Sequence, residues 1–393
     1  MKTKVIIIGA GYAGILCANR LEKQNEGVEV TIISEYPYFQ ERIRFHEIAS
    51  QQKEKKIPIQ NLLRKKINFV NGKVIEIVPK NNQVVLRSLV GNFTLDYDFL
   101  VVSIGSSGIK KQNDAEYSIQ SLESLQNFLN NKNPDRIQNL CVLGGGLTGI
   151  ELAVEWKEKY PNQVVTVIDK SPFAKSFSKT GKTYIHNKFK NLGIQIIDSI
   201  QIQSIGSEKI IFQNHKEIQY DSLINCTGFQ IYPLLKESGF LTNDLNQVYV
   251  DPFLRSKQFQ NVFVAGDAAK LEHSILRMGC VTALPMGAYV ADVLSNTIKN
   301  KDLSPFSFQF FGRCVSLGRK DGLIQWTYGD DTPKEWVITG KLAALIKEIV
   351  NRFTIFSLKM EKYLPFRFYF WPKGSVYKLK NYEFGNGEIQ SES

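Results

Sequence analysis

The same glycine-rich turn pattern occurs twice in this chain. It reads Gly9-Ala10-Gly11-Tyr12-Ala13-Gly14 in the first copy and Gly144-Gly145-Gly146-Leu147-Thr148-Gly149 in the second. Apolar runs that predict buried strands stand on both sides of each copy, and a helical pattern follows its third glycine. The strands are expected at residues 4–8, 28–33, 140–143 and 164–168, and the helices at residues 15–21 and 150–157. Each copy therefore opens a predicted strand–turn–helix–strand unit.

Such a turn has a physical reason to bind a dinucleotide. The glycines allow a tight turn, close approach of the backbone to a pyrophosphate and close packing of helix on strand. The first turn of the helix also offers free N–H groups and the positive end of a dipole. The alternative, two glycine turns without a ligand, is disfavoured because both copies stand in the same structural context. The sequence thus predicts two dinucleotide sites in one chain.

Three further apolar runs end in glycine. The run at residues 261–269 contains Gly266-Asp267 before a stretch of small residues, where the backbone can approach a ligand and a carboxylate can accept from its hydroxyls. The alternative for Asp267 is a helix cap alone. The other two runs, residues 99–105 and 222–228, end at Gly105 and Gly228.

Together these motifs resemble the two-dinucleotide flavoproteins of the pyridine nucleotide-disulfide oxidoreductase superfamily, over about the first 290 residues. The resemblance implies an α/β fold with two Rossmann-like domains, to which this chain adds an amphipathic C-terminal segment. It also implies that FAD binds at the first turn, NAD(P)H at the second, and the flavin ribityl chain and pyrophosphate beside Asp267. The cofactor-binding residues implied are Gly9, Gly11, Tyr12, Ala13, Gly14, Gly105, Gly266 and Asp267 for FAD, and Gly144, Gly146, Leu147, Thr148, Gly149 and Gly228 around the nucleotide.

The resemblance also sets the expected domain limits. We expect a discontinuous FAD-binding domain at residues 1–110 and 231–330, because Gly105 and Gly228 mark two crossovers. The NAD(P)H-binding domain is expected between them at residues 111–230, and a basic aromatic segment at residues 331–393.

The ends of the second strands bear on nucleotide choice. Asp169 lies 20 residues beyond Gly149, where a carboxylate accepts from ribose hydroxyls and repels a 2′-phosphate. This favours NADH over NADPH, although the neighbouring Lys170 is a cation that can serve a phosphate. In the first unit, either Glu35 reaches the FAD ribose from a shifted strand end, or Ser34 makes that contact and Glu35 is solvated.

The catalytic candidate is Glu151. Residues 146–151 are similar to the GxTGxE pattern of the type II NADH dehydrogenase-like group, in which the glutamate stands beside the nicotinamide and the flavin edge. The alternative is an exposed first-turn glutamate favoured by the helix dipole. Arg42 or Arg44 is expected to approach the flavin, unless it pairs with Glu41 or Glu47.

The five cysteines are scattered and form no Cys-x-x-Cys or Cys-x-x-x-x-Cys pair. A dithiol mechanism is therefore disfavoured, and a reducing, cytoplasmic compartment is expected. No metal site is expected. No run of 18 apolar residues is present, so we expect no membrane-spanning helix. The opening residues imitate a signal peptide, but the glycine turn interrupts the apolar run.

The C-terminal segment carries most of the net charge of +11. Residues 334–380 hold ten Lys or Arg against three acids, and residues 363–371 are rich in aromatics. A helical apolar stripe is formed by Leu342, Leu345, Ile346, Ile349, Val350, Phe353, Phe356 and Met360. This pattern favours a surface that lies on an anionic bilayer, on the inner face of the cell membrane. The alternative is a stripe packed onto its own FAD domain or onto a partner subunit, as in a homodimer.

The expected activity is an NADH dehydrogenase that uses FAD and passes electrons to a quinone or quinone-like acceptor. One departure weakens the quinone assignment, because Leu284 and Ala288 occupy the positions of the two glutamines in the group's AQxxxQ motif. The alternatives are a soluble NAD(P)H oxidoreductase with a protein or other small acceptor, and a redox-responsive FAD/NADH-binding interaction protein. Nucleic-acid binding is disfavoured because the basic excess lies in the aromatic segment and no binding motif is present.

Overall fold

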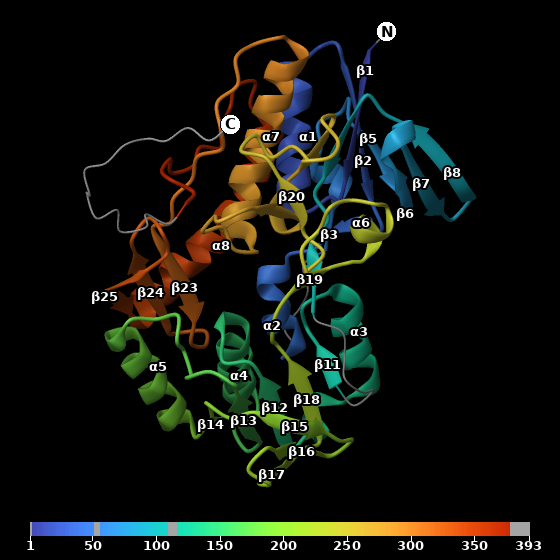
Figure 1. The fold of residues 1–393 in the computed structure, drawn as a ribbon. Coiled ribbons are helices and arrows are strands. Elements are labelled where there is room, and N and C mark those ends of the chain that lie inside the picture. The colour runs from blue at the N-terminus through green and yellow to red at the C-terminus, as the bar shows by residue number, and fades with distance from the viewer. Residues whose placement is uncertain (1, 51–55, 109–115, 378–393) are drawn as a thin grey trace, which may run out of the picture.

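The computed structural model describes residues 2–50, 56–108 and 116–377, and its two central sheets occupy opposite ends of the molecule (Figure 1). The first sheet is parallel, with the order β21-β9-β1-β2-β5. Its strands are β1 (Thr3–Ile8), β2 (Val28–Ser34), β5 (Asn68–Asn71), β9 (Phe99–Val102) and β21 (Val262–Val264). The apolar run of β1 is almost completely buried, as expected for a central parallel strand.

The second sheet repeats this plan. It is also parallel and has the order β11-β18-β12-β13-β14. Its strands are β11 (Glu116–Ser118), β12 (Asn139–Leu143), β13 (Val164–Ile168), β14 (Gln195–Ile197) and β18 (Ser222–Asn225). The four strands expected around the two glycine turns are therefore present, and the predicted α/β fold with two nucleotide-binding units is confirmed.

The helices follow the same order as the motifs. They are α1 (Tyr12–Gln24), α2 (Phe45–Ala49), α3 (Leu122–Asn131), α4 (Leu147–Lys159), α5 (Lys179–Leu192), α6 (Leu234–Glu237), α7 (Cys280–Ile298) and α8 (Gly340–Tyr363). Helices α1 and α4 each begin within a glycine turn. Helix α7 packs closely along α1. The absence of a side chain at Gly287 permits this approach, since a Cβ there would lie 2.3 Å from the carbonyl oxygen of Ala13. The first nucleotide unit thus has a helix pair on one face.

Smaller sheets surround the two units, and all are antiparallel except the two-stranded pair formed by residues 248–250 and 269–271, which is parallel. Three of them have three strands: β6 (Lys73–Val78), β7 (Gln83–Ser88) and β8 (Gly91–Asp96); β15 (Ile202–Ile205), β16 (Lys209–Phe212) and β17 (Glu217–Gln219); and β23 (Gly312–Ser316), β24 (Gly322–Thr327) and β25 (Pro333–Thr339). The two-stranded pairs are β3 (Tyr38–Phe39) with β4 (Ile57–Pro58), β10 (Ser106–Ser107) with β19 (Gln230–Ile231), and β20 (Val248–Val250) with β22 (Ala269–Leu271).

The pair β10–β19 bears on the domain limits. These short strands follow the two expected crossovers and pair with each other, Ser106 opposite Ile231. Strand β21 then returns to the edge of the first sheet beside β9. We keep the limits near residues 110 and 230 as a proposal supported by this pairing. A limit at residue 330 would cut the sheet β23–β25, so we propose to place it before β23.

Helix α8 exposes its apolar face and buries its polar face, the reverse of what a helix that packs on a protein core usually does. Six members of the apolar stripe, Leu342, Leu345, Ile349, Val350, Phe353 and Phe356, are 45 to 57% exposed. The residues buried beneath the helix are mostly polar: Lys347, Asn351, Thr354, Ser357 and Glu361, with the apolar Ala343 and Leu358. The interpretation that the stripe packs onto its own FAD domain is therefore wrong for these six positions.

Ion pairs hold the C-terminal end of α8 in place. Arg20 of α1 contacts the Glu361 carboxylate at 2.5 Å, and Lys23 contacts its other oxygen at 2.9 Å. Glu361 is fully buried, and Arg20 also donates to the carbonyl of Tyr369 at 2.6 Å. Because a buried charge is tolerated only with such partners, the polar face of α8 is fixed to this site. None of the helices in the described part of the chain has both the length and the apolar composition that a membrane span requires.

Candidate active site

The first glycine turn is built for close approach. Gly9 has φ +100°, and a Cβ there would lie 2.6 Å from the carbonyl oxygen of Ser103. A Cβ on Gly14 would lie 1.9 Å from the carbonyl oxygen of Gly9, whereas a Cβ on Gly11 meets nothing within 4 Å. Gly9 and Gly14 are therefore required by the fold itself. Gly11 is left open, which is what a pyrophosphate needs.

The residues that follow begin α1. Tyr12 and Ala13 are buried, and the ring of Tyr12 packs edge-on against Phe39 with centroids 5.0 Å apart. The hydroxyl of Ser103 donates to the carbonyl oxygens of Ile8 and Gly9 at 2.9 and 2.8 Å. This hydroxyl pins the turn to the neighbouring strand, a role that sequence reasoning did not assign.

The second turn has the same construction. Gly144 has φ +101°, and its Cβ would lie 3.1 Å from the side chain of Thr227. A Cβ on Gly149 would lie 1.9 Å from the carbonyl oxygen of Gly144, whereas a Cβ on Gly146 again meets nothing within 4 Å. Leu147 and Thr148 form the first turn of α4. Gly228, at φ +56°, follows Thr227 on the adjacent crossover. The two turns thus fit the same kind of ligand.

Asp169 braces the second turn. One carboxylate oxygen accepts from the N–H of Gly145 at 2.7 Å, and the other accepts from the N–H of Ser171 at 2.8 Å. In the first unit, Glu35 instead forms an exposed ion pair with Lys73 at 3.1 Å. The hydroxyl of Ser34 accepts from the N–H of Tyr36. The two units therefore differ at the position where a ribose is expected.

Asp267 joins three segments and does more than cap a helix. Its carboxylate accepts from the N–H of Gly279, just before α7, at 2.8 Å, and from the hydroxyl of Ser106 at 2.7 Å. Arg42 stands 3.5 Å from the same carboxylate and donates to the Ser106 hydroxyl at 3.2 Å. A Cβ on Gly105 would lie 2.9 Å from the Arg42 guanidinium. The structure thus brings Arg42, Gly105 and Asp267 together, beside Gly266 at φ +71°.

The ion pairs considered for Arg42 are made by its neighbour. Arg44 contacts Glu41 at 2.8 Å, Glu47 at 3.0 Å and Glu348 of α8 at 3.0 Å. Arg42 therefore contacts Asp267 and Ser106 instead of these glutamates.

Glu151 lies at the centre of a buried polar cluster. It is 9% exposed, so the interpretation as an exposed first-turn glutamate is wrong. One oxygen accepts from the N–H of Ser316 in β23 at 3.0 Å and contacts the ammonium of Lys347 from α8. The other oxygen stands 3.7 Å from His46 Nδ1. Three segments that are distant in sequence therefore converge on a carboxylate carried by α4.

Burial sets the protonation of this cluster. Desolvation lowers the pKa of Lys347 to about 7, so its ammonium can release a proton at neutral pH. Burial also holds the pKa of His46 well below its ordinary value, with the cations Lys347 and Arg319 acting in the same direction, so His46 is neutral. Sequence reasoning missed Lys347, which it counted among the ten basic residues of the C-terminal segment. No local signal could have found it, since its position follows from how α8 docks.

The positions of the two missing glutamines lie inside α7. Leu284 is 4% exposed and Ala288 is fully buried, and both belong to the core of the first unit. Neither position offers a polar group to an acceptor.

Comparison with known proteins assigns the family. Residues 3–291 match the family model described as pyridine nucleotide-disulphide oxidoreductase. The chain belongs to this family. By sequence it is similar to the type II NADH:quinone oxidoreductase of Staphylococcus saprophyticus, with 24% identity over 398 residues that cover 91% of this chain and 96% of that protein. The family expected from the sequence is thereby confirmed.

Two solved structures of oxidoreductases share the fold. The sulfide:quinone oxidoreductase of Aquifex aeolicus superposes with a TM-score of 0.76 at 22% identity, over 92% of each chain. The NDH2 of Plasmodium falciparum in complex with NADH superposes with a TM-score of 0.75 at 16% identity, over 92% of this chain and 98% of that one. At these identities the likeness establishes the fold alone.

Proposed function

We propose that this oxidoreductase is an FAD-dependent NADH:quinone oxidoreductase. The cofactors are FAD and NADH, in keeping with the family and with the relatives named as type II enzymes. The observation that carries the proposal is the pair of matched glycine turns, each with one glycine whose Cβ would meet no protein atom. Each turn therefore has room for the pyrophosphate of a dinucleotide, and two such sites in one chain support an enzyme that passes electrons between two dinucleotides.

The residues present fit both cofactors. FAD would be held by the turn from Gly9 to Gly14 at the start of α1, with Asp267 accepting from ribityl hydroxyls and Arg42 beside it. NADH would be held by the turn from Gly144 to Gly149. When bound, the flavin accepts hydride from the nicotinamide and passes electrons on to the acceptor. The protein contributes orientation and a low-dielectric site.

Asp169 supports NADH as the preferred nucleotide. Its carboxylate is fixed by Gly145 and Ser171, yet each oxygen has a further lone pair that can accept from a ribose hydroxyl. The same charge would repel a 2′-phosphate.

Glu151 and Lys347 would supply a proton during reduction of the quinone. Reduction of a quinone to a quinol consumes two protons, and Lys347 Nζ can release one near pH 7. The Glu151 carboxylate, fixed by the N–H of Ser316, would orient the ammonium of Lys347 toward the acceptor, which takes the released proton. The buried, neutral His46 excludes water from one side of the pair.

The exposed face of α8 supports association with a membrane surface. Its apolar side chains lie beside an excess of basic residues, and an exposed apolar surface of this kind indicates an interaction site. We propose that this face lies on the anionic inner leaflet of the cell membrane. A homodimer that buries the same face is the competing arrangement. Sedimentation of the protein without lipid at several concentrations would reveal it.

A soluble acceptor is the second candidate function, and the buried Leu284 and Ala288 favour it. Steady-state oxidation of NADH by the FAD-loaded protein separates the two. A short-chain quinone, oxygen and a one-electron dye would be compared, each with and without anionic liposomes. Fast turnover with the quinone, increased by liposomes, is expected. Flavin reduction by NADH with turnover on the dye alone would overturn the quinone assignment, and a long-lived reduced flavin with negligible turnover would indicate a binding protein.

A further inference from the structure

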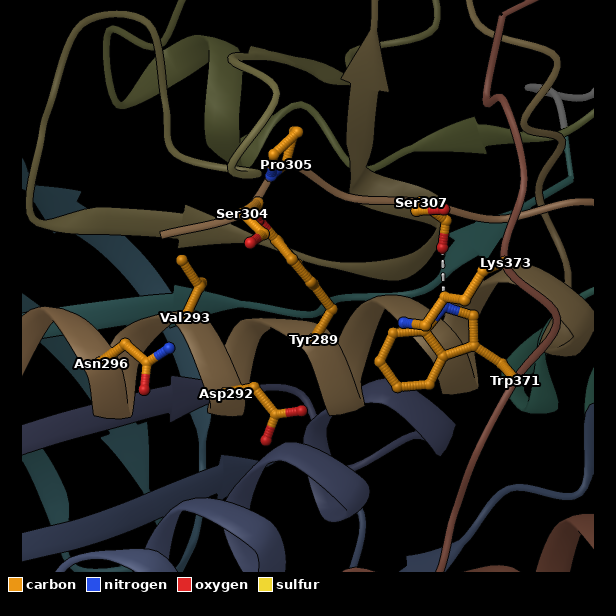
Figure 2. Close-up of a pocket in the computed structure, with 9 residues that line it drawn as sticks. All are labelled: Tyr289, Asp292, Val293, Asn296, Ser304, Pro305, Ser307, Trp371 and Lys373. Carbon is orange, nitrogen blue, oxygen red and sulfur yellow. Dashed lines mark hydrogen bonds between the residues drawn. The ribbon is translucent and has the colours of Figure 1, made fainter. Parts of the chain in front are cut away.

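A cavity lies along the C-terminal half of α7, away from the Asp267 cluster. Its volume is about 310 Å³, within the range of small-molecule sites. Helix α7 forms its floor, the chain at residues 304–307 forms one wall, and the segment after α8 closes one end (Figure 2). It is lined by Tyr289, Asp292, Val293, Asn296, Ser304, Pro305, Ser307, Trp371 and Lys373. From Cys280 to Asp292 the helix rises about 18 Å, so this cavity is separate from the proposed flavin site.

The walls of the cavity are preformed. The indole N–H of Trp371 donates to the carbonyl of Ser307 at 2.8 Å (Figure 2), and the N–H of Gly374 donates to the Ser307 hydroxyl at 3.0 Å. On the opposite side, the hydroxyl of Tyr289 donates to the carbonyl of Ser304 at 2.6 Å. These bonds tie the segment after α8 and the 304–307 chain to the rest of the fold. A ligand would therefore meet an ordered site.

The cavity favours an anion. Its one carboxylate, Asp292, is neutralised by Arg20 at 3.3 Å and Arg367 at 3.4 Å, and it accepts from Gln24 at 2.9 Å. Lys373 forms no ion pair with any described residue, and its ammonium lies over the Trp371 ring, 3.2 Å from the centroid. Partial burial lowers the pKa of Lys373 to about 8, with the nearby charge of Asp292 acting in the opposite direction, and Lys373 stays mostly charged at pH 7. A free cation beside an aromatic ring thus faces a cavity whose own acid is already paired.

The cavity also adjoins the exposed apolar surface. Phe366 and Phe370, on the segment that leads to Trp371, are 60% and 75% exposed. This segment is continuous with the stripe of α8, because Phe356 packs against Phe368 with ring centroids 5.6 Å apart. Lys373 lies three residues beyond the exposed Phe370, so if this apolar surface enters a bilayer the cavity would adjoin the headgroups, where basic pockets bind phosphates.

We propose that this cavity binds the phosphodiester headgroup of an anionic membrane lipid. Lys373 would contact the phosphate, and the amide of Asn296 and the hydroxyl of Ser304 would bind hydroxyls of the headgroup. Trp371 would lie at the boundary with the acyl chains. The inference rests on the membrane association proposed above and adds a defined site to a general surface attraction.

The test compares Lys373→Gln with Lys359→Gln. Lys359 is an exposed lysine of α8, so both variants lose one surface charge and differ only in their relation to the cavity. Co-sedimentation would use phosphatidylcholine vesicles that contain either phosphatidylglycerol or the same fraction of a sulfate-headed lipid. Wild-type protein should prefer the phosphatidylglycerol vesicles. Each variant should bind about fivefold less to both vesicles through lost charge, but only Lys373→Gln should lose the preference, and Lys373→Arg should restore it.

Three outcomes would overturn the inference. Equal preference in the two variants would show that the cavity takes no part. No preference in the wild type would leave only surface attraction. If inorganic phosphate at constant ionic strength abolished the preference and quenched Trp371 without vesicles, as judged against Trp371→Phe, the site would be one for free phosphate. NADH oxidation with a short-chain quinone and no lipid should be unchanged in Lys373→Gln. Failure of that activity in the wild type would count against the proposed function and not against the cavity.

Discussion

Each nucleotide turn has one glycine with open space around it, so a single added methyl group can impair one cofactor site and leave the other intact. Gly11 has φ −85° and Gly146 has φ −81°, both ordinary for alanine, and a Cβ at either position meets no protein atom within 4 Å. Gly11→Ala and Gly146→Ala should therefore fold normally. Their apoproteins should be as stable as the wild type, or slightly more stable, because alanine reduces the freedom of the unfolded chain.

The cost should appear when the cofactor binds. A methyl group in the space needed by a pyrophosphate acts like overpacking, at about 1–3 kcal/mol. That corresponds to roughly 5- to 150-fold weaker binding. Gly11→Ala should lose FAD on purification and rebind it weakly. Gly146→Ala should keep its flavin and require a higher NADH concentration for flavin reduction.

Gly14→Ala provides the control within the same turn. Its Cβ would lie 1.9 Å from the carbonyl oxygen of Gly9, so the fold itself must distort and the apoprotein should melt at a lower temperature. The assays are thermal unfolding of FAD-free protein, fluorescence titration with FAD and flavin reduction by NADH. If Gly11→Ala purifies with a full complement of FAD and wild-type affinity, the proposed path of the pyrophosphate is refuted. If the Gly11→Ala apoprotein melts at a temperature as low as that of Gly14→Ala, the inference that position 11 has room for a Cβ is refuted.

Three further predictions concern α8. Burial lowers the pKa of Lys347 from 10.5 to about 7, so the unfolded state binds more protons than the folded state between these pH values. The free energy of unfolding should therefore rise with pH across this interval. Thermal melts of Lys347→Met should lack that rise. Glu361→Gln leaves buried cations without a partner and should cost about 3 kcal/mol in denaturant titrations; Glu217→Gln, in an exposed pair with Lys209, should cost less than about 1 kcal/mol. Replacing Phe353 by Ser should weaken liposome binding by about 1 kcal/mol without lowering the melting temperature, because this side chain is 47% exposed; a lower melting temperature would place it in the core.

Glu151 shows how far local patterns reach. Its place on the helix after the second turn follows from the motif, and the structure has it there in α4. Its partners could not be predicted, because Ser316 and Lys347 lie more than 160 residues away and arrive through β23 and α8. Arg42 and Arg44 present the same limit. The sequence left both open to the same acids, and the tertiary structure separates their roles by placing Arg42 beside Asp267 and Glu348 of α8 beside Arg44.

The sequence by itself determined the two nucleotide turns and the parallel strands on either side of them. These depend on steric rules that act within a few residues, namely positive φ at Gly9 and Gly144 and contact between the first and third glycines. The tertiary structure alone decided the orientation of α8. Periodicity shows which residues share a face of a helix, but the face that is buried depends on its partners. Here Arg20 binds Glu361 from 341 positions away, so the polar face is buried and the apolar face remains exposed.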